Sequence, residues 1–407
     1  MIKWKPFDII DGTIIISNLQ NEFIAYNPYN KMISKFETDN YCNETIKESL
    51  SNHNFILQAQ QIQRQPSLTF SVSDQCNLNC IYCFSEGIKS NNEAQFTKSV
   101  ARAIDIFLAS CSNKKPTIAF FGAGEPFLNT AFIKQVIEYS NLSSLKYGKE
   151  PTYLATSNCT FNSDSLDIII KHNIYISASI DGDSCIQNRQ RPFTSGANTF
   201  SVVQANITQL IDNNIPFHVR STITDRSVKL MPNLVEYWSK KGISKVFFEP
   251  VILYNNTALC SQPSAKDFAY YFLLAFEKAK ELNITIETEA IRKLGLGADK
   301  YFCPALSGDN LLYTTNGKRS FCYEELGASS ENIFISNELS YSTDKIKSLL
   351  DEYNWPSEDC KVCPIAPACG FTCPKRAYET NNSFDFPYKW QCKLNKLLIP
   401  EMISKLV

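Results

Sequence analysis

Three cysteines, Cys76, Cys80 and Cys83, share one short stretch, SDQCNLNCIYCFSEG, in the spacing C-x-x-x-C-x-x-C. Three thiolates on one loop can bind three irons of a [4Fe–4S] cube, and the fourth iron then stays open to a small molecule. The spacing alone also fits a zinc knuckle or a redox-active C-x-x-C pair. The stretch therefore predicts a metal or redox site, with the open-iron cube as the favoured form.

The same stretch resembles the signature loop of the radical SAM superfamily, with Tyr82 directly before the last cysteine. The resemblance implies that the open iron chelates the amino and carboxylate groups of S-adenosylmethionine. An electron from the cluster would cleave this cofactor, and the resulting 5′-deoxyadenosyl radical would remove a hydrogen atom from the substrate. The protein would position the cofactor and exclude water and oxygen.

Residues after later strands resemble positions at which this superfamily binds the cofactor. GAGEP, which begins at Gly122, is similar to the family's Gly-Gly-Glu-Pro motif, although an alanine separates the two glycines here. In the family the Glu carboxylate, here Glu125, receives the methionine ammonium. Ser157 and Asn158 stand where the family often has Thr-Asn-Gly. A role in an ordinary turn is the alternative for such loop residues.

Two further segments carry the same resemblance. SASIDG is similar to a Ser-x-Asp-Gly pattern that faces the ribose and the methionine carboxylate, and Arg191 is similar to an arginine that follows it and suits a bidentate carboxylate contact. Arg220 and Glu249 end at the same side of the sheet by topology, with a surface role as the alternative. The residues expected to bind the cofactor are Tyr82, Gly122, Gly124, Glu125, Ser157, Asn158, Ser179, Asp181, Arg191 and Arg220.

Seven more cysteines lie between residues 303 and 392, including a C-x-x-C-x5-C-x3-C run. Their spacing resembles the SPASM extension of radical SAM peptide and protein maturases, with a pair of zinc ribbons as the alternative. The resemblance implies two auxiliary [4Fe–4S] clusters, for a total of three. Cys303, Cys322 and Cys373 would bind the first, and Cys360, Cys363, Cys369 and Cys392 the second.

The first auxiliary cluster is expected to lack a fourth cysteine. Fully ligated relatives supply one shortly after the first ligand, whereas the corresponding stretch here, PALSGDN, contains none. Asp309 is the nearest oxygen ligand. We therefore expect either Asp309 or an open iron able to take a substrate thiolate.

Alternating strands and helices must position these residues. Six apolar, β-branched strands are expected at 68–73, 117–122, 152–157, 174–180, 217–223 and 245–250. Amphipathic helices are expected near 94–110, 129–142, 163–172, 199–213, 229–241 and 265–282. The fold class is thus α/β, a partial (β/α)6 TIM-like barrel with its chemistry at the carboxyl ends of the strands.

The barrel is flanked by further units. A small α+β unit is expected before a glutamine-rich linker, with a hairpin turn at Asn27-Pro28 and a helix over 45–55. Asn316-Gly317 marks another hairpin. The expected divisions are the N-terminal unit, 1–66; the barrel, 67–252; a helical bridge, 253–302; the extension, 303–392; and a C-terminal helix, 393–407.

Composition limits the function classes. The chain has 407 residues, 40 basic and 41 acidic side chains and a net charge of -1, so no broad nucleic-acid surface is expected. No export signal and no membrane-spanning run is visible, so we expect a cytoplasmic protein without a membrane partner. Its 15 cysteines should then be reduced, available for metal binding, catalysis or packing.

The favoured function is a peptide maturase that installs a radical-derived crosslink, with a cysteine thioether as the favoured product. Its partners would be a peptide or protein substrate with a leader segment and a low-potential electron donor. The N-terminal unit resembles peptide-recognition elements that bind a leader by strand addition, and a structural cap on the barrel is the alternative. Two other functions stay open: a sulfatase-type maturase that forms formylglycine, and a non-catalytic iron–sulfur electron carrier.

Overall fold

A computed structural model describes residues 2–10, 12–28, 32–37, 66–85, 90–253, 259–292, 294, 303, 310–320, 322–326, 335–336, 348, 351 and 356–406. Three features of the sequence analysis lie outside the described residues: Asp309, most of the glutamine-rich linker, and the helix expected over 45–55.

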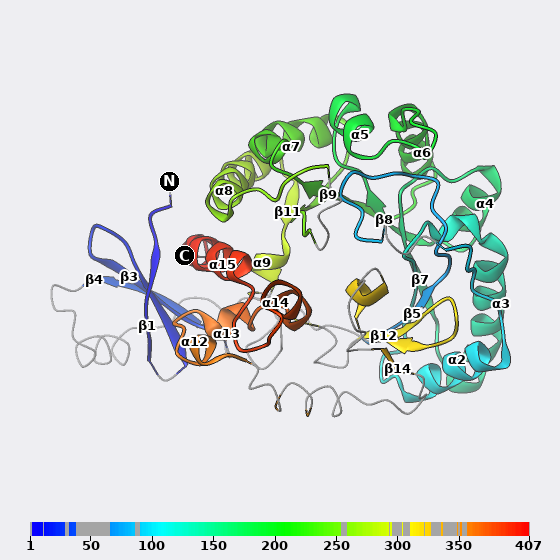
Figure 1. Cartoon of the computed structure of the whole chain (residues 1–407), viewed down its shortest axis with the longest axis horizontal. Coiled ribbons are helices and arrows are strands. Elements are labelled where there is room, and N and C mark those ends of the chain that lie inside the picture. Colours follow the sequence, from blue (N-terminus) through cyan, green and yellow to red (C-terminus); the bar gives the residue numbers. More distant parts are fainter. Residues whose placement is uncertain are drawn as a thin grey trace.

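A curved, mainly parallel sheet forms the body of the molecule, with helices on its outer face (Figure 1). Its strand order is β11-β10-β9-β8-β7-β6-β5-β12-β13-β14. The six predicted strands are confirmed as β5 (Ser67–Ser71), β6 (Thr117–Phe121), β7 (Thr152–Ser157), β8 (Tyr175–Ser179), β9 (Phe217–Ile223) and β10 (Lys245–Pro250). Side chains alternate along each strand, so Leu68 and Phe70 join the core under the helices while Thr69 faces the barrel interior.

The sheet is wider than the six predicted strands. β11 (Thr285–Glu287) pairs in parallel with β10, and β12 (Asn310–Tyr313) pairs in parallel with β5. Both strands are short, and they lie in segments that the sequence analysis assigned to a helical bridge and to the cysteine-rich extension. Short strands carry too few residues to show a period, which explains why they were not predicted.

Each predicted helical segment overlaps an outer helix, and the structure adds α5 (Ser184–Gln190), which was not predicted. The outer helices are α2 (Lys98–Ser110), α3 (Thr130–Tyr147), α4 (Ser163–Lys171), α5, α6 (Phe200–Asp212), α7 (Met231–Lys240) and α8 (Ala265–Glu281), with short turns η2 (Pro126–Leu128) and η3 (Val228–Leu230). Side chains of Thr97, Asn129, Asn162 and Ser264 accept backbone N–H groups at the helix starts. Such caps satisfy donors that the first turn leaves free, and so they fix where each βα loop ends.

The cysteine-rich region lies across the open side of the barrel (Figure 1). It contains β13 (Arg319–Ser320), β14 (Ile335–Ser336), η5 (Tyr323–Leu326), α12 (Glu358–Lys361), α13 (Ala366–Cys369) and α14 (Pro374–Asn381), and α9 (Glu289–Arg292) precedes it. The predicted hairpin at Asn316-Gly317 is confirmed between β12 and β13, with Gly317 at a φ of 78°. The final helix, α15 (Lys389–Ser404), begins before the predicted residue 393 and therefore carries Cys392.

The described N-terminal residues form a four-stranded antiparallel sheet: β1 (Lys5–Ile10), β2 (Thr13–Ser17), β3 (Glu22–Asn27) and β4 (Met32–Glu37). The predicted turn after Asn27 joins β3 to β4. One face of this sheet packs on the extension and on α15. The residues of this shared core are Trp4, Ile14, Ile16, Ile24, Tyr26 and Ile33 of the N-terminal unit and Ile365, Ala368, Ile399 and Ile403. Glu401 on α15 also accepts the backbone N–H of Trp4 at 2.7 Å.

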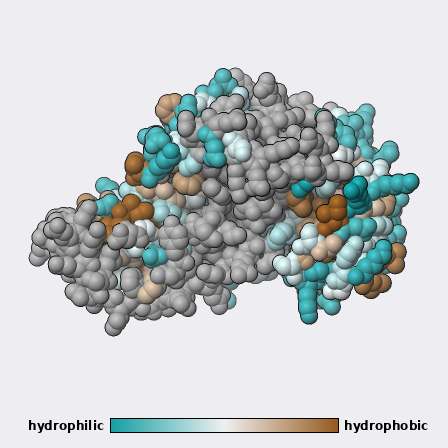
Figure 2. All heavy atoms as spheres, turned by 90° about the horizontal axis from the view of Figure 1, so that it is seen from below, coloured by the Kyte–Doolittle hydropathy of each residue, from teal (hydrophilic) through white to brown (hydrophobic). Residues whose placement is uncertain are grey.

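Apolar side chains on the described surface stand in small groups among hydrophilic ones, as the view from below shows (Figure 2). Exposed apolar side chains include Leu142 and Leu145 on α3 and Ile106 on α2, and scattered exposure of this kind is ordinary for a protein surface. Within the described part of the chain, no helix has the length and apolarity needed to cross a membrane.

Candidate active site

The three-cysteine loop follows β5 and is held by backbone hydrogen bonds to the segment after α5. Asn79 N–H donates to Pro192 O at 2.8 Å, and Ile81 N–H donates to Gln190 O at 3.0 Å. Cys76, Cys80 and Cys83 are partly exposed and free of disulfides. Burial raises the pKa of the Cys80 thiol to about 12, since neighbouring Arg191 offsets only part of that effect.

The glycines of GAGEP bring a second loop directly against the cysteine loop. Gly124 N–H donates to Ser73 O at 3.0 Å, and Glu125 N–H donates to Gln75 O at 2.8 Å. A Cβ atom would lie 2.6 Å from Ser73 O at Gly122 and 1.8 Å from Gln75 O at Gly124. The two glycines of Gly-Ala-Gly thus allow the two backbones to approach closely, because neither has a Cβ. This approach places Glu125 next to the cysteine loop.

Glu125 is buried among donors at the carboxyl ends of β6 and β7. Its carboxylate accepts Ser157 Oγ–H at 2.8 Å, Asn158 N–H at 2.7 Å and Phe127 N–H at 3.2 Å. Burial nevertheless raises the pKa of Glu125 to about 7, because the hydrogen bonds compensate only in part. The group can therefore change protonation near neutral pH, and a cationic ligand would favour its charged form.

Asn158 links Glu125 to the cysteine loop. Its backbone N–H bonds Glu125, and its side-chain Nδ2 donates to Asn77 Oδ1 at 2.9 Å and lies 4.0 Å from Cys76 Sγ. Cys159, the next residue, has a φ of 59° and is fully buried, and burial raises the pKa of its thiol. A thiol in that environment is a packing residue and not a nucleophile.

Asp181, after β8, is fully buried and its carboxylate is surrounded by protein donors. It accepts Tyr82 O–H, Gln190 Nε2–H at 2.7 Å and Thr222 N–H at 3.0 Å. Arg191 Nε completes the group at 3.1 Å. The side chain thus holds Tyr82 and Arg191 in place, and its lone pairs are directed at the protein itself.

Arg191 connects this carboxylate to the cysteine loop. Its guanidinium carbon lies 5.3 Å from the centre of the Tyr82 ring, and Nη1 lies 3.8 Å from Cys80 Sγ. A buried guanidinium beside a sulfur suits a thiolate, since it stabilises negative charge. By contrast, Ser179 is half-buried at the end of β8 and Arg220 is exposed on β9.

The structure adds two residues that the sequence analysis did not select. Gln190 bonds Asp181 and also accepts Thr224 Oγ1–H at 2.9 Å. Tyr323, on η5, lies 3.0 Å from Thr69 Oγ1 through its hydroxyl, and its ring packs edge-on against Phe121 at 4.9 Å. The signal for Tyr323 was its place directly after Cys322, because a residue next to a predicted cluster ligand is expected to lie near the same site.

The segment that carries Tyr323 is fixed by an ion pair. Arg376 on α14 donates to both oxygens of Glu324, with Nε at 3.0 Å from Oε1, and its Nη1 lies 2.8 Å from Glu289 Oε2. A forked contact of this kind adds orientation as well as attraction. Arg376 thus connects three elements: α14, which carries it, η5 and α9.

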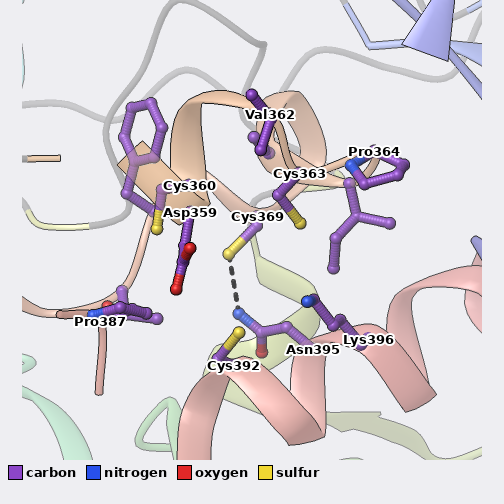
Figure 3. Close-up of a pocket in the computed structure, with 14 residues that line it drawn as sticks. Asp359, Cys360, Val362, Cys363, Pro364, Cys369, Pro387, Cys392, Asn395 and Lys396 are labelled. Atoms are coloured by element: carbon purple, nitrogen blue, oxygen red, sulfur yellow. Dashed lines mark hydrogen bonds between the residues drawn. The ribbon is translucent and has the colours of Figure 1, made fainter. Parts of the chain in front are cut away.

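Four of the extension cysteines surround one cavity. Cys360, Cys363, Cys369 and Cys392 line a space of about 390 Å³ between α12, α13 and α15 (Figure 3). Asn395 and Lys396 line the same cavity from α15. In the described part of the chain, no three ligand side chains meet as they would around a single metal ion.

Four cysteines around one cavity are a donor set that either a zinc ion or an iron–sulfur cube could use. The donor set of free thiols therefore fits the predicted second auxiliary cluster.

The other three extension cysteines are less completely defined. Cys322 and Cys373 are buried and Cys303 is partly exposed. The pKa of the Cys373 thiol is raised well above its ordinary value by burial, then by Glu324, and also by Cys303, which shows that Cys303 and Cys373 lie near each other. None of the three is in a disulfide, which fits the predicted first auxiliary site, while Asp309 is outside the described residues.

An open parallel barrel with a three-cysteine loop at the carboxyl end of its first strand defines a class of iron–sulfur enzymes. Residues 70–227 match the family described as the Radical SAM superfamily. These residues therefore form a radical SAM domain, and the chain has the fold of the solved structures described below. A radical SAM domain implies a [4Fe–4S] cluster and S-adenosylmethionine, in agreement with the cofactors expected from the sequence.

Sequence relatives cover different parts of the chain. An uncharacterized protein of Methanocaldococcus jannaschii is 26% identical over 262 residues, 62% of this chain and 89% of that protein. A cysteine-type anaerobic sulfatase-maturating enzyme of Clostridium novyi is 20% identical over 44% of this chain and 49% of its own. The radical SAM cyclopropyl synthase TigE of Paramaledivibacter caminithermalis is 22% identical over 60% and 55%. The chain thus spans about half the length of these two enzymes.

Solved structures extend the likeness in fold. Native anSMEcpe with bound AdoMet aligns with a TM-score of 0.67 at 17% identity, over 84% of this chain and 98% of that one. Streptococcus suis SuiB bound to precursor peptide SuiA aligns with a TM-score of 0.61 at 14% identity, over 95% and 99%. The shared fold therefore includes regions beyond the barrel.

Proposed function

We propose that this chain is a radical SAM maturase that modifies a ribosomally made peptide, with a thioether crosslink as the favoured product. The observation that carries the proposal is the direct backbone contact of Gly124 and Glu125 with Ser73 and Gln75, the residues just before Cys76. This contact places three thiols, a buried carboxylate and a buried arginine at one end of the barrel. The cysteine-lined cavity of the extension supports a maturase with auxiliary clusters.

Cys76, Cys80 and Cys83 would hold a cluster, and this cluster would supply the electron for cleavage of S-adenosylmethionine. Other side chains would bind the cofactor beside it. Glu125 would accept the ammonium group once its own proton is lost. Ser157, Asn158 and the glycines hold Glu125 and the loop in register. Ser179 and Arg220, which face the barrel opening, are free to contact the rest of the cofactor or the substrate.

We assign Asp181 a positioning role that differs from the direct cofactor contact expected from the sequence. Its carboxylate already accepts from Tyr82, Gln190 and Thr222 and pairs with Arg191. A ligand hydroxyl would have to compete with these donors. Asp181 would therefore act by orienting Arg191, whose guanidinium also stabilises the Cys80 thiolate.

A peptide substrate is supported by the fold shared with SuiB bound to precursor peptide SuiA. The N-terminal sheet, whose outer strands are β1 and β4, would bind a leader segment by strand addition. Its covered face packs on the extension, so a bound leader would sit beside the auxiliary clusters. Electrons would come from a low-potential donor protein.

The first auxiliary cluster would complete its coordination with Asp309 or leave one iron for a substrate thiolate. Mössbauer spectra of a variant that retains only this cluster would decide between these ligand sets and a fully cysteine-ligated cube. Four equivalent cysteine-ligated irons would contradict the proposal.

A sulfatase-type maturase that forms formylglycine is the second candidate, favoured by the anSMEcpe fold and the Clostridium novyi relative. Sulfatase maturases resemble this chain but carry an aspartate after the second extension cysteine. Here Tyr323 follows Cys322 and places a phenol against Thr69 and Phe121. A phenol is a far weaker base than a carboxylate at neutral pH, which weighs against formylglycine formation.

Anaerobic reconstitution followed by a 5′-deoxyadenosine assay tests the chemistry. Cys80→Ala should abolish cofactor cleavage, whereas Cys363→Ala should retain much of it and lose peptide modification. Mass analysis of a cysteine-containing peptide after co-expression then separates a crosslink from formylglycine. A protein that is fully loaded with iron but forms no 5′-deoxyadenosine would overturn the proposal of an enzyme and would favour an iron–sulfur electron carrier.

A further inference from the structure

Asn395 is a buried amide directed at a cluster sulfur. Its side-chain Nδ2 donates to Cys369 Sγ at 3.0 Å, and the residue is only 1% exposed (Figure 3). Cys392, Asn395 and Lys396 are spaced i, i+3 and i+4 on α15, so they occupy one face of this helix. The same helix face therefore supplies a proposed iron ligand and a hydrogen bond to a second one.

An asparagine is an unexpected residue at this place. The neighbouring helix positions Leu394 and Leu398 are buried and apolar. The Oδ1 atom of Asn395 is buried and has no hydrogen-bond partner among the described residues. A buried acceptor of this kind destabilises the fold. The only compensation in the described structure is the contact with Cys369, which indicates a role at that sulfur.

Charged residues around the cavity do not supply the same effect. Lys396 and Asp359 both line it and carry opposite charges. Their fields act against each other, and both side chains face solvent more than Asn395 does. The neutral amide is thus the distinctive feature of this site.

We propose that Asn395 is a positioning residue that raises the reduction potential of the second auxiliary cluster through its N–H bond to Cys369 Sγ. The inference rests on the proposed function, because it requires a [4Fe–4S] cluster at Cys360, Cys363, Cys369 and Cys392. Reduction adds one electron to the cluster and makes its sulfurs more negative. A donor fixed at a sulfur therefore stabilises the reduced form more than the oxidised form.

The test is a redox titration monitored by electron paramagnetic resonance. The background carries Cys76, Cys80 and Cys83 each changed to Ala, together with Cys303→Ala and Cys322→Ala, so that only the second auxiliary cluster contributes. Asn395→Leu has a similar size and removes the donor. We expect unchanged iron content and a reduction equilibrium about tenfold less favourable, which is about 59 mV for one electron.

Asn381→Leu is the matched control, because its amide donates only to the backbone carbonyls of Ala377 and Phe386. Asn395→Asp is the second variant, in case Asn395→Leu binds less iron. It keeps the shape and places a carboxylate oxygen at the sulfur, so its potential should fall further. Unchanged potentials at full loading in either variant would overturn the inference alone. Absence of a cluster from the parent background would instead overturn the proposed cluster assignment.

Discussion

At the scale of single residues, the site depends on buried groups whose environments change their ordinary behaviour. Glu125 and Arg191 have opposite charge and are both buried within the same end of the barrel. Glu125 has a raised pKa because burial outweighs three hydrogen bonds, while Arg191 stays paired with Asp181. The raised pKa of Glu125 and the ion pair of Arg191 can each be measured in the protein without substrate.

Glu125 should make stability depend on pH in a defined direction. Its folded pKa of about 7 exceeds the ordinary value of 4.5, so its stabilising contribution is complete below pH 4.5 and is lost as pH rises through 7. The loss should amount to about 3 kcal/mol. Glu125→Gln should flatten this part of the stability profile measured by denaturant unfolding, and exposed Glu138→Gln should not. A profile that stays steep in Glu125→Gln would refute the assignment.

Cofactor affinity should change with pH in the opposite direction at the same residue. The ammonium of S-adenosylmethionine requires the charged carboxylate, so affinity should rise as pH increases through about 7. Calorimetric titration of the reconstituted protein would show this rise, and Glu125→Gln should bind weakly at every pH. An equal pH dependence in both proteins would point to a different group.

Gly124 allows a direct test of the contact between the two loops. In Gly124→Ala the new Cβ would lie 1.8 Å from Gln75 O, so the cysteine loop would have to move. We expect loss of iron from the cluster of that loop, read as fewer irons per chain. Gly182→Ala is the control, because the atoms nearest to its new Cβ belong to the side chains of Leu234 and Ile186 and not to the backbone. Equal iron content in Gly124→Ala and wild type would show that the loop accommodates the change.

At the scale of elements, the sequence predicted those parts whose pattern repeats locally. The six barrel strands and their helices follow from apolar alternation and from caps such as Thr97 and Asn162. β11 and β12 were missed because each forms from three or four residues that need an existing sheet edge to pair with. The contacts of Asp181 were not predictable either, since they join α5 and β9 to the cysteine loop across long chain separations.

Arg376 should couple three elements, η5, α9 and α14. Arg376→Leu would leave Glu324 and Glu289 without their shared cation, and their partial exposure limits the expected loss of stability to about 1–3 kcal/mol. A double-mutant cycle with Glu324→Gln should show a coupling energy above about 0.5 kcal/mol. Additive losses in the two variants would mean that the forked contact does not hold η5 in solution.

At the scale of the whole molecule, the N-terminal sheet and the last helix stabilise one another. Ile399 is fully buried between them and lies on the helix that carries Cys392. The extension has few apolar residues of its own, so this shared core and the proposed clusters must hold it together. The position of the N-terminal sheet was not predictable from its own residues, because its partners lie near the other end of the chain.

Ile399→Ala should therefore affect both stability and iron content. Truncation of a fully buried isoleucine typically destabilises by about 2–5 kcal/mol. We expect a lower denaturant midpoint and loss of iron from the second auxiliary cluster, while the cluster of the Cys76 loop is retained. Leu142→Ala, at a side chain that is 69% exposed, is the control. Normal iron content in a destabilised Ile399→Ala protein would separate the shared core from cluster assembly.

The packing of the N-terminal sheet on α15 also has a consequence during synthesis on the ribosome. The sheet is made long before Ile399, Ile403 and Glu401 of α15, on which it packs. At ~5–20 residues per second, the apolar face of the sheet waits on the order of tens of seconds for these partners. Because Cys392 lies on the same helix, iron insertion at the proposed second auxiliary site and burial of this sheet face both have to wait until α15 has been made.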